Sequence, residues 1–136
     1  ESIGDARFFL HQATNYAHDR KVFGGPIGRN QGIQFPLARA HAETEAAELM
    51  ARKAAALFDR GVPCGGEANM AKLLCAEAAW HAGEACMQTF GGFAFSREYD
   101  IERKWREARL YLTAPVSTNL LLAYIGQHIL GLPKSY

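Results

Sequence analysis

Residues 88–92, Gln88-Thr89-Phe90-Gly91-Gly92, are the stretch whose residue types and spacing say most about chemistry. A helix that only had to end would need one glycine in the left-handed conformation. A second glycine leaves two backbone units bare, so that another backbone or a flat ligand could come within contact distance. Gln88 brings amide donors and an acceptor to the same place. We predict a ligand-contacting turn, with a helix cap that carries a spare glycine as the alternative.

A second candidate site is the segment from Arg20 to Gln31. It places a guanidinium at a helix end, the aromatic Phe23 at a turn, and the amide side chains of Asn30 and Gln31 at the start of the next helix. The planar fork of arginine suits phosphate, and a helix start offers free N–H groups. The alternative is an arginine favoured by the helix dipole and followed by an ordinary loop.

Other chemistries have little support in the residue pattern. The chain has no Glu-x-x-His and no paired Cys-x-x-Cys, so we predict no metal site. The basic residues between 97 and 109 are interleaved with acidic ones and the formal net charge is +1, so we expect no nucleic-acid partner. No stretch approaches the ~20 apolar residues of a membrane span, so we expect no membrane insertion.

The three cysteines are spaced by eleven residues, about three helical turns. We interpret Cys64, Cys75 and Cys86 as small buried thiols on one helix face. An odd number without close pairs fits a reducing compartment, and we expect a cytoplasmic location.

Hydrophobic periodicity predicts helices throughout, and no β-alternation exceeds four residues. We expect a single all-α domain over residues 1–136. Its architecture would be an antiparallel up-down four-helix bundle with an additional short helix before the last one. The expected helices run to about Lys21, from Gln31 or Gln34 to Arg60, from Cys64 or Gly66 to Thr89, from Asp100 to Arg109, and from Pro115 toward Gly131. Apolar stripes are expected at Met70, Leu73, Leu74, Trp80 and Met87, and at Leu120, Leu121, Tyr124, Ile125, His128 and Ile129.

Three motifs occur together in one order: Arg20-Lys-x-Phe23-Gly24-x-Pro-Ile27-x-x-x-Gln31, then Gln88-x-Phe-Gly91-Gly92, then Glu98-Tyr99-x-Ile-Glu-Arg with Arg106-Glu-Ala-Arg109. This order resembles the carboxy-terminal helical domain of acyl-CoA dehydrogenases over nearly the whole chain. The resemblance implies the C-terminal part of a longer three-domain flavoenzyme that binds FAD between subunits. Its implied partners are an acyl-CoA substrate, the preceding domains of the polypeptide, and further copies in a homodimer or homotetramer.

The resemblance also implies roles for individual residues. Arg20 would reach the FAD pyrophosphate, and Gln88, Gly91 and Gly92 would receive the cofactor from the neighbouring subunit. The remaining implied cofactor contacts are Phe23 and Ile27 on the adenine side, Asn30 and Gln31 nearby, and Ser117 and Asn119 at the start of the last helix. Asn30 stands where relatives often carry histidine.

The run Pro115-Val116-Ser117 stands where many relatives place the catalytic carboxylate in Glu-Gly-Thr, and proline cannot take a proton. An isovaleryl-type arrangement would put the base about two helical turns before Glu1. We therefore expect no catalytic residue in this chain and no turnover by the chain alone. The implied reaction of the whole enzyme is α,β-dehydrogenation of an acyl-CoA thioester. An acyl-CoA oxidase-like relative, or a non-catalytic helical interaction domain without cofactor, are the alternatives.

Overall fold

The computed structural model describes residues 1–134, and helices account for most of them. The long helices are α1 (Ser2–Asp19), α2 (Gln31–Asp59) and α3 (Gly65–Phe90), and the shorter ones are α4 (Ile101–Leu110) and α5 (Thr118–Tyr124). A two-stranded hairpin, β1 (Lys21–Val22) and β2 (Gly25–Pro26), joins α1 to α2 through the 3-10 turn η1 (Ile27–Arg29). A second 3-10 turn, η2 (Gly91–Phe95), follows α3, and the π-helical turn η3 (Ile125–Ile129) continues α5.

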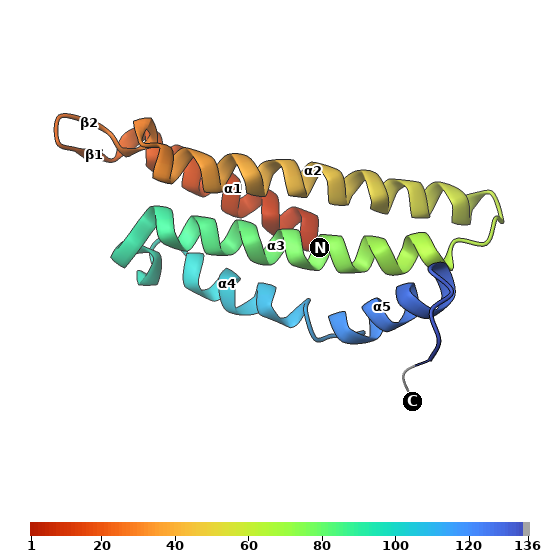
Figure 1. Ribbon diagram of the computed structural model, residues 1–136. Helices are drawn as coiled ribbons and strands as arrows, with labels where there is room; N and C mark the ends of the chain where they lie inside the picture. Colours follow the sequence, from red (N-terminus) through yellow and green to blue (C-terminus); the bar gives the residue numbers. More distant parts are fainter. Residues whose placement is uncertain (135–136) are drawn as a thin grey trace.

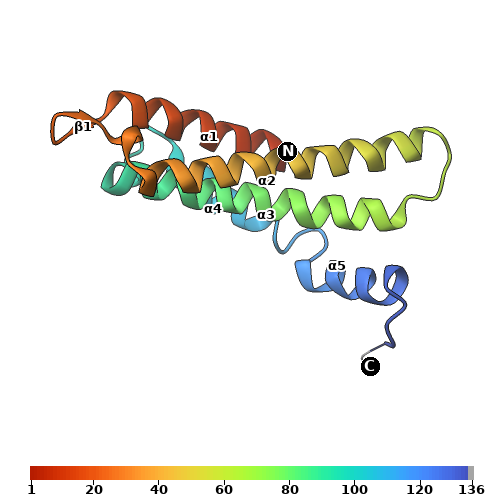
Figure 2. The same cartoon turned by 45° about the horizontal axis from the view of Figure 1, so that its top comes forward.

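The helices form an antiparallel bundle, which confirms the predicted fold class (Figure 1). The direction of the chain reverses between α1 and α2, between α2 and α3, and between α3 and α4. The fourth position is shared, because α4 and α5 follow one another along α3. In both views the hairpin and the C-terminal end of α3 lie at the same end of the bundle (Figure 2). The two segments singled out in the sequence are therefore neighbours in space.

Small residues build much of the core. Residues Ala79, Ala82 and Ala85 of α3 belong to one buried cluster with residues of α1, α2 and α4. A Cβ added at Gly83 would lie 3.3 Å from both Phe9 and Trp105, so the helices approach closely here. Of the apolar stripe predicted for the third helix, Leu73 is buried and Leu74 is 38% exposed. Periodicity in the sequence predicted that the large apolar residues form the core. In the structure, alanines lie at the closest helix–helix contacts, because their small side chains let the backbones approach.

The thiols differ in environment more than their spacing suggested. Cys86 is fully buried in the core, and burial raises the pKa of its thiol to about 12. Cys75 is half-buried, and Cys64 is half-buried at the residue immediately before α3. The prediction of three buried thiols is thus right for Cys86 alone.

The first helix is shorter than predicted. It ends at Asp19 rather than near Lys21, because Arg20 already has extended backbone (φ −70°, ψ 116°) and Lys21 pairs with Pro26 in the hairpin. The connection between α1 and α2 is therefore a short antiparallel ladder. Helix α2 carries Pro36 in its second turn, as expected for a proline close to a helix start.

The last helix begins at Thr118 and not at Pro115. Ser117 has extended backbone, and its hydroxyl oxygen accepts a hydrogen bond from the Leu120 N–H at 3.5 Å, so serine and not proline sets the start. Of the predicted apolar face, Leu121 is buried while Leu120 is 63% and Ile129 is 48% exposed.

Candidate functional site

A groove of about 540 Å³ lies where the end of α1, the hairpin and the end of α3 meet. We call it the glycine groove. Five of the ten predicted cofactor-binding residues line it, together with residues of the same elements that the sequence analysis did not assign. The predicted ones are Arg20, Ile27, Gln88, Gly91 and Gly92, and the others are Tyr16, Val22, Thr89, Phe90 and Phe93.

The two glycines of the groove differ in what the chain itself requires of them. Gly91 ends α3 with φ 59° and ψ −133°, a conformation that side-chain-bearing residues rarely adopt. Gly92 has no such φ, and a Cβ built on it would meet no atom within 4 Å. Both glycines are exposed. Neither strain nor packing within the chain accounts for Gly92, so its bare backbone leaves room for a ligand in the groove.

Arg20 supplies the charge of the groove. Its backbone is fixed on both sides, because its N–H donates to Tyr16 O and its own carbonyl accepts from the Ile27 N–H, each at 2.9 Å. Among the described residues, Arg20 is the only charged side chain lining the groove. The arginine ion pairs within residues 1–134 involve Arg7, Arg52, Arg103 and Arg106. The Arg20 guanidinium is therefore available to an anion.

The turn of the hairpin carries an aromatic side chain, Phe23, that is exposed to solvent. Phe23 and Gly24 occupy the turn with φ 52° and 77°, the pair of positive values typical of a tight two-residue hairpin. Phe23 is 95% exposed and does not line the glycine groove. Arg29 secures the turn by donating to Phe23 O at 3.2 Å, and its guanidinium occupies the space that a Cβ on Gly25 would need.

The predicted amide residues lie beside a second groove. Asn30 is the capping residue of α2 but makes no side-chain capping bond, so its amide stays free, and Gln31 is exposed beside it. Gly32, the next residue, lines a groove of about 510 Å³ between α2 and α3, and Gln88 lines both this groove and the glycine groove. The two hollows therefore meet at Gln88, an arrangement that suits an elongated ligand.

Ser117 and Asn119 lie apart from these grooves. They stand at the start of α5, and the ten residues of α4, about 15 Å of helix, separate that start from the η2 end of the bundle. The Ser117 hydroxyl caps α5 by accepting a hydrogen bond from the Leu120 N–H, whereas Asn119 is exposed. The structure thus brings together the arginine, isoleucine, glutamine and glycine positions but not these two.

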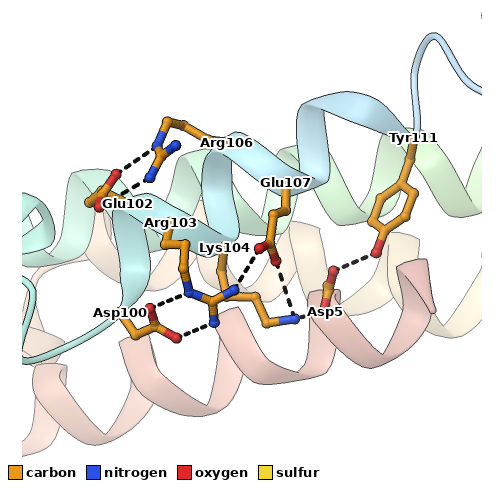
Figure 3. A network of polar contacts seen from close by, with 8 residues as sticks. All are labelled: Asp5, Asp100, Glu102, Arg103, Lys104, Arg106, Glu107 and Tyr111. Atoms are coloured by element: carbon orange, nitrogen blue, oxygen red, sulfur yellow. Dashed lines mark hydrogen bonds and ion pairs between the residues drawn. The ribbon is translucent and has the colours of Figure 1, made fainter.

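Most charged side chains of α4 are paired within the chain (Figure 3). Arg103 pairs with Asp100 and Glu107, and Arg106 pairs with Glu102. Lys104 reaches the buried Asp5 of α1 at 2.6 Å, and the Tyr111 hydroxyl donates to the same carboxylate at 2.7 Å. These bonds neutralise Arg103, Lys104 and Arg106 and tie α4 to α1, whereas the Arg109 guanidinium lies 5.6 Å from the centroid of the Trp80 ring.

Residues 1–134 contain no group of three or more His, Cys, Asp or Glu side chains placed to hold a metal ion. None of their helices combines the length and apolar character that a membrane crossing requires.

A family model described as the acyl-CoA dehydrogenase C-terminal domain matches residues 1–130. The chain belongs to the acyl-CoA dehydrogenase family. The resemblance seen in the three motifs is thereby confirmed.

Relatives from this family cover nearly the whole chain. Acyl-CoA dehydrogenase FadE12 of Mycobacterium tuberculosis is 42% identical over 137 residues, which are 99% of this chain and 35% of that protein. A glutaryl-coenzyme A dehydrogenase in complex with glutaryl-CoA matches with a TM-score of 0.92 and 34% identity over 98% of this chain and 34% of that one. The FAD complex of PigA matches with a TM-score of 0.91 and 27% identity, over 96% and 34%. The chain therefore spans about a third of the length of each of these proteins.

Proposed function

We propose that this chain works as the C-terminal domain of an FAD-dependent acyl-CoA dehydrogenase that converts an acyl-CoA thioester to its α,β-unsaturated form. The single observation that carries the proposal is the glycine groove, in which open backbone at Gly92 faces the same hollow as the unpaired charge of Arg20. A pyrophosphate needs a cation and close backbone approach, and these residues offer both.

The family resemblance implies a role for each predicted cofactor contact, and the chemistry of these residues suits it. Arg20 would donate two parallel N–H bonds to the pyrophosphate oxygens, and charge-assisted bonds of this kind contribute ~1.5–3 kcal/mol each. Gln88 would add amide bonds at the point where the two grooves meet. Ile27 and the exposed ring of Phe23 would cover the adenine side, with Asn30 and Gln31 bonding nearby.

The arrangement also bears on which subunit supplies which contact. Arg20 and Gln88 line one groove, so both would serve the same FAD molecule. Ser117 and Asn119 lie on the far side of α4, and we assign them to the cofactor of another copy of the chain. An FAD held between subunits would thus take groove contacts from one protomer and α5 contacts from its partner.

α,β-Dehydrogenation removes a proton from the α-carbon and a hydride from the β-carbon of the thioester, and FAD supplies the hydride acceptor. The residues of this domain would bind and orient that cofactor and help to keep the site dry. Pro115, where many family members carry the catalytic carboxylate, is exposed in the turn between α4 and α5 and has no group to take a proton. We assign the base to a segment before Glu1 and the acyl pocket to the preceding domains.

The test uses the full-length protein, stripped of flavin and titrated with FAD while flavin fluorescence is recorded. We expect Arg20→Ala to raise the FAD dissociation constant by about tenfold or more, because a charge-assisted contact is lost. ADP, which carries the pyrophosphate but no isoalloxazine, should be weakened as a competitor by a similar factor. Riboflavin, which lacks the pyrophosphate, should compete as before.

The matched control is Arg60→Ala. Arg60 also follows the last residue of a long helix and is exposed, but it lies at the opposite end of the bundle. It should leave the FAD affinity unchanged. Equal FAD affinity for wild type and Arg20→Ala would contradict the pyrophosphate role. A wild-type protein that purifies colourless and takes up no added FAD would overturn the function itself.

A further inference from the structure

The guanidinium of Arg20 contacts the aromatic ring of Phe93, which lies in η2 directly after Gly91 and Gly92. The Arg20 Cζ lies 5.8 Å from the centroid of the Phe93 ring, within the range of a cation–π contact. No hydrogen bond or ion pair of the Arg20 side chain competes with this contact within residues 1–134. The ring is therefore the described feature that decides where the charge lies.

The Phe93 ring is itself held in place by other aromatic residues. Its centroid is 6.2 Å from that of Tyr99 in an edge-on contact and 6.5 Å from that of Tyr16. Tyr16 stacks on Phe90 with centroids 4.1 Å apart, and Phe90 meets Tyr99 edge-on at 5.1 Å. Four rings from α1, α3, η2 and the segment before α4 thus form a platform. A ring fixed by such neighbours can orient a flexible arginine at little entropic cost.

Arg20 needs such support because it stands between two hollows. Arg20, Tyr16, Phe90 and Phe93 line the glycine groove and also a neighbouring hollow of about 410 Å³. That second hollow is also lined by Asp19, whose carboxylate would attract a free guanidinium. A long side chain at this boundary could turn into either hollow, and the Phe93 ring, which lines both, is the described group in contact with its guanidinium.

We propose that Phe93 is a positioning residue for cofactor binding, which orients the Arg20 guanidinium toward the glycine groove through a cation–π contact. The inference rests on the proposed FAD site. It explains why an aromatic residue follows the glycine pair directly and remains 49% exposed. The same turn that bares the backbone of Gly92 also supplies the ring that orients the cation.

The experiment is a double-mutant cycle on FAD binding in the full-length protein. We expect Phe93→Leu to raise the FAD dissociation constant by about two- to fivefold, the effect of an exposed cation–π contact, and Phe93→Tyr to restore it. In an Arg20→Ala background, Phe93→Leu should have no further effect. Arg20→Lys keeps the charge but loses the planar fork, so it should weaken FAD binding less than Arg20→Ala does.

The control is Phe95→Leu, the same substitution two residues away in η2, on a ring that is 70% exposed and makes no aromatic contact within the described residues. It should leave FAD binding unchanged. Additive effects of Arg20→Ala and Phe93→Leu would overturn the inference while the FAD site stands, because the ring would then act independently of the arginine. No effect of Arg20→Ala would remove the FAD role of Arg20 and the positioning role of Phe93 together.

Discussion

At the scale of single residues, Gly92 is a groove residue whose small size no backbone strain or contact within the described residues explains. Gly91 is needed for its backbone conformation, and Gly83 for the close approach of Phe9 and Trp105. Gly92 has ordinary φ and open space where its side chain would be. Gly92 lines the groove that carries the Arg20 charge, so the open space at its Cβ position is available to a ligand in that groove.

This reasoning predicts a separation between folding and binding. We expect Gly92→Leu to leave the thermal midpoint of the full-length protein within a few degrees of wild type, because a Cβ at this exposed position meets no atom within 4 Å. It should nevertheless lower FAD affinity strongly, since the leucine occupies the groove. Gly91→Ala is the contrasting variant and should lower both, because its φ of 59° is strained for any side chain. Normal FAD affinity of Gly92→Leu in fluorescence titration would refute the bare-backbone interpretation.

At the scale of elements, the hairpin and η1 are pressed against the end of α1. A Cβ on Gly28 would lie 3.0 Å from the carbonyl oxygen of Ala17, an atom of helical backbone that cannot move aside alone. The Gln34 amide also donates to Gly28 O at 2.8 Å and holds η1 on the start of α2. The segment that carries Arg20 and Ile27 is thus positioned by contacts on both helices.

We therefore expect Gly28→Ala to displace η1 from α1 and to cost about 1–3 kcal/mol of stability, as overpacking usually does. FAD affinity should fall as well. The Ile27 N–H donates to the Arg20 carbonyl, so a displacement of η1 would also disturb the backbone of Arg20. The control is Gly4→Ala in α1, where the added methyl group meets nothing within 4 Å and a helical alanine should be neutral or stabilising. Denaturant unfolding and FAD titration of both variants make the comparison, and equal behaviour would show that the Gly28 contact does not constrain the segment.

At the scale of the whole molecule, α2 leaves an apolar stripe uncovered. Phe35, Ala42, Ala46 and Leu49 recur at steps of seven, four and three residues, so they share one side of the helix. All four are exposed, with Phe35 at 61% and Leu49 at 69%. Small residues between large ones let another helix approach closely. We propose that this stripe packs against a second copy of the chain, in the homodimer or homotetramer expected from the family resemblance.

The prediction for this surface is that Ala46→Glu will shift the full-length protein toward smaller assemblies in sedimentation velocity. A carboxylate buried in an apolar contact without a partner is costly. Ala55→Glu introduces the same charge on the opposite side of α2, where Ala55 is also exposed, and should leave the assembly unchanged. An unaltered sedimentation coefficient for Ala46→Glu would exclude the stripe from the subunit interface.

Sequence reasoning was most successful where a local rule decides the outcome. Helical periodicity predicted the five helices and their order, because burial of one apolar face follows a period of 3.6 residues. It failed at helix ends and in the details of burial. Helix α1 ends before Arg20 because Lys21 pairs with Pro26 in the hairpin, and Ser117 rather than Pro115 caps α5. These outcomes depend on competing hydrogen bonds that residue types alone do not rank.

The residue order alone determined the helical class of this chain, the motifs that place it in its family, and the identity of Arg20, Gln88 and Gly92 as residues of interest. Only the tertiary structure decided that these three line one groove, that Ser117 and Asn119 lie elsewhere, and that the Phe93 ring holds the Arg20 charge. The physical reason is that secondary structure follows from contacts a few residues apart. A binding groove requires residues some seventy positions apart to meet, and the packing of whole helices governs that meeting.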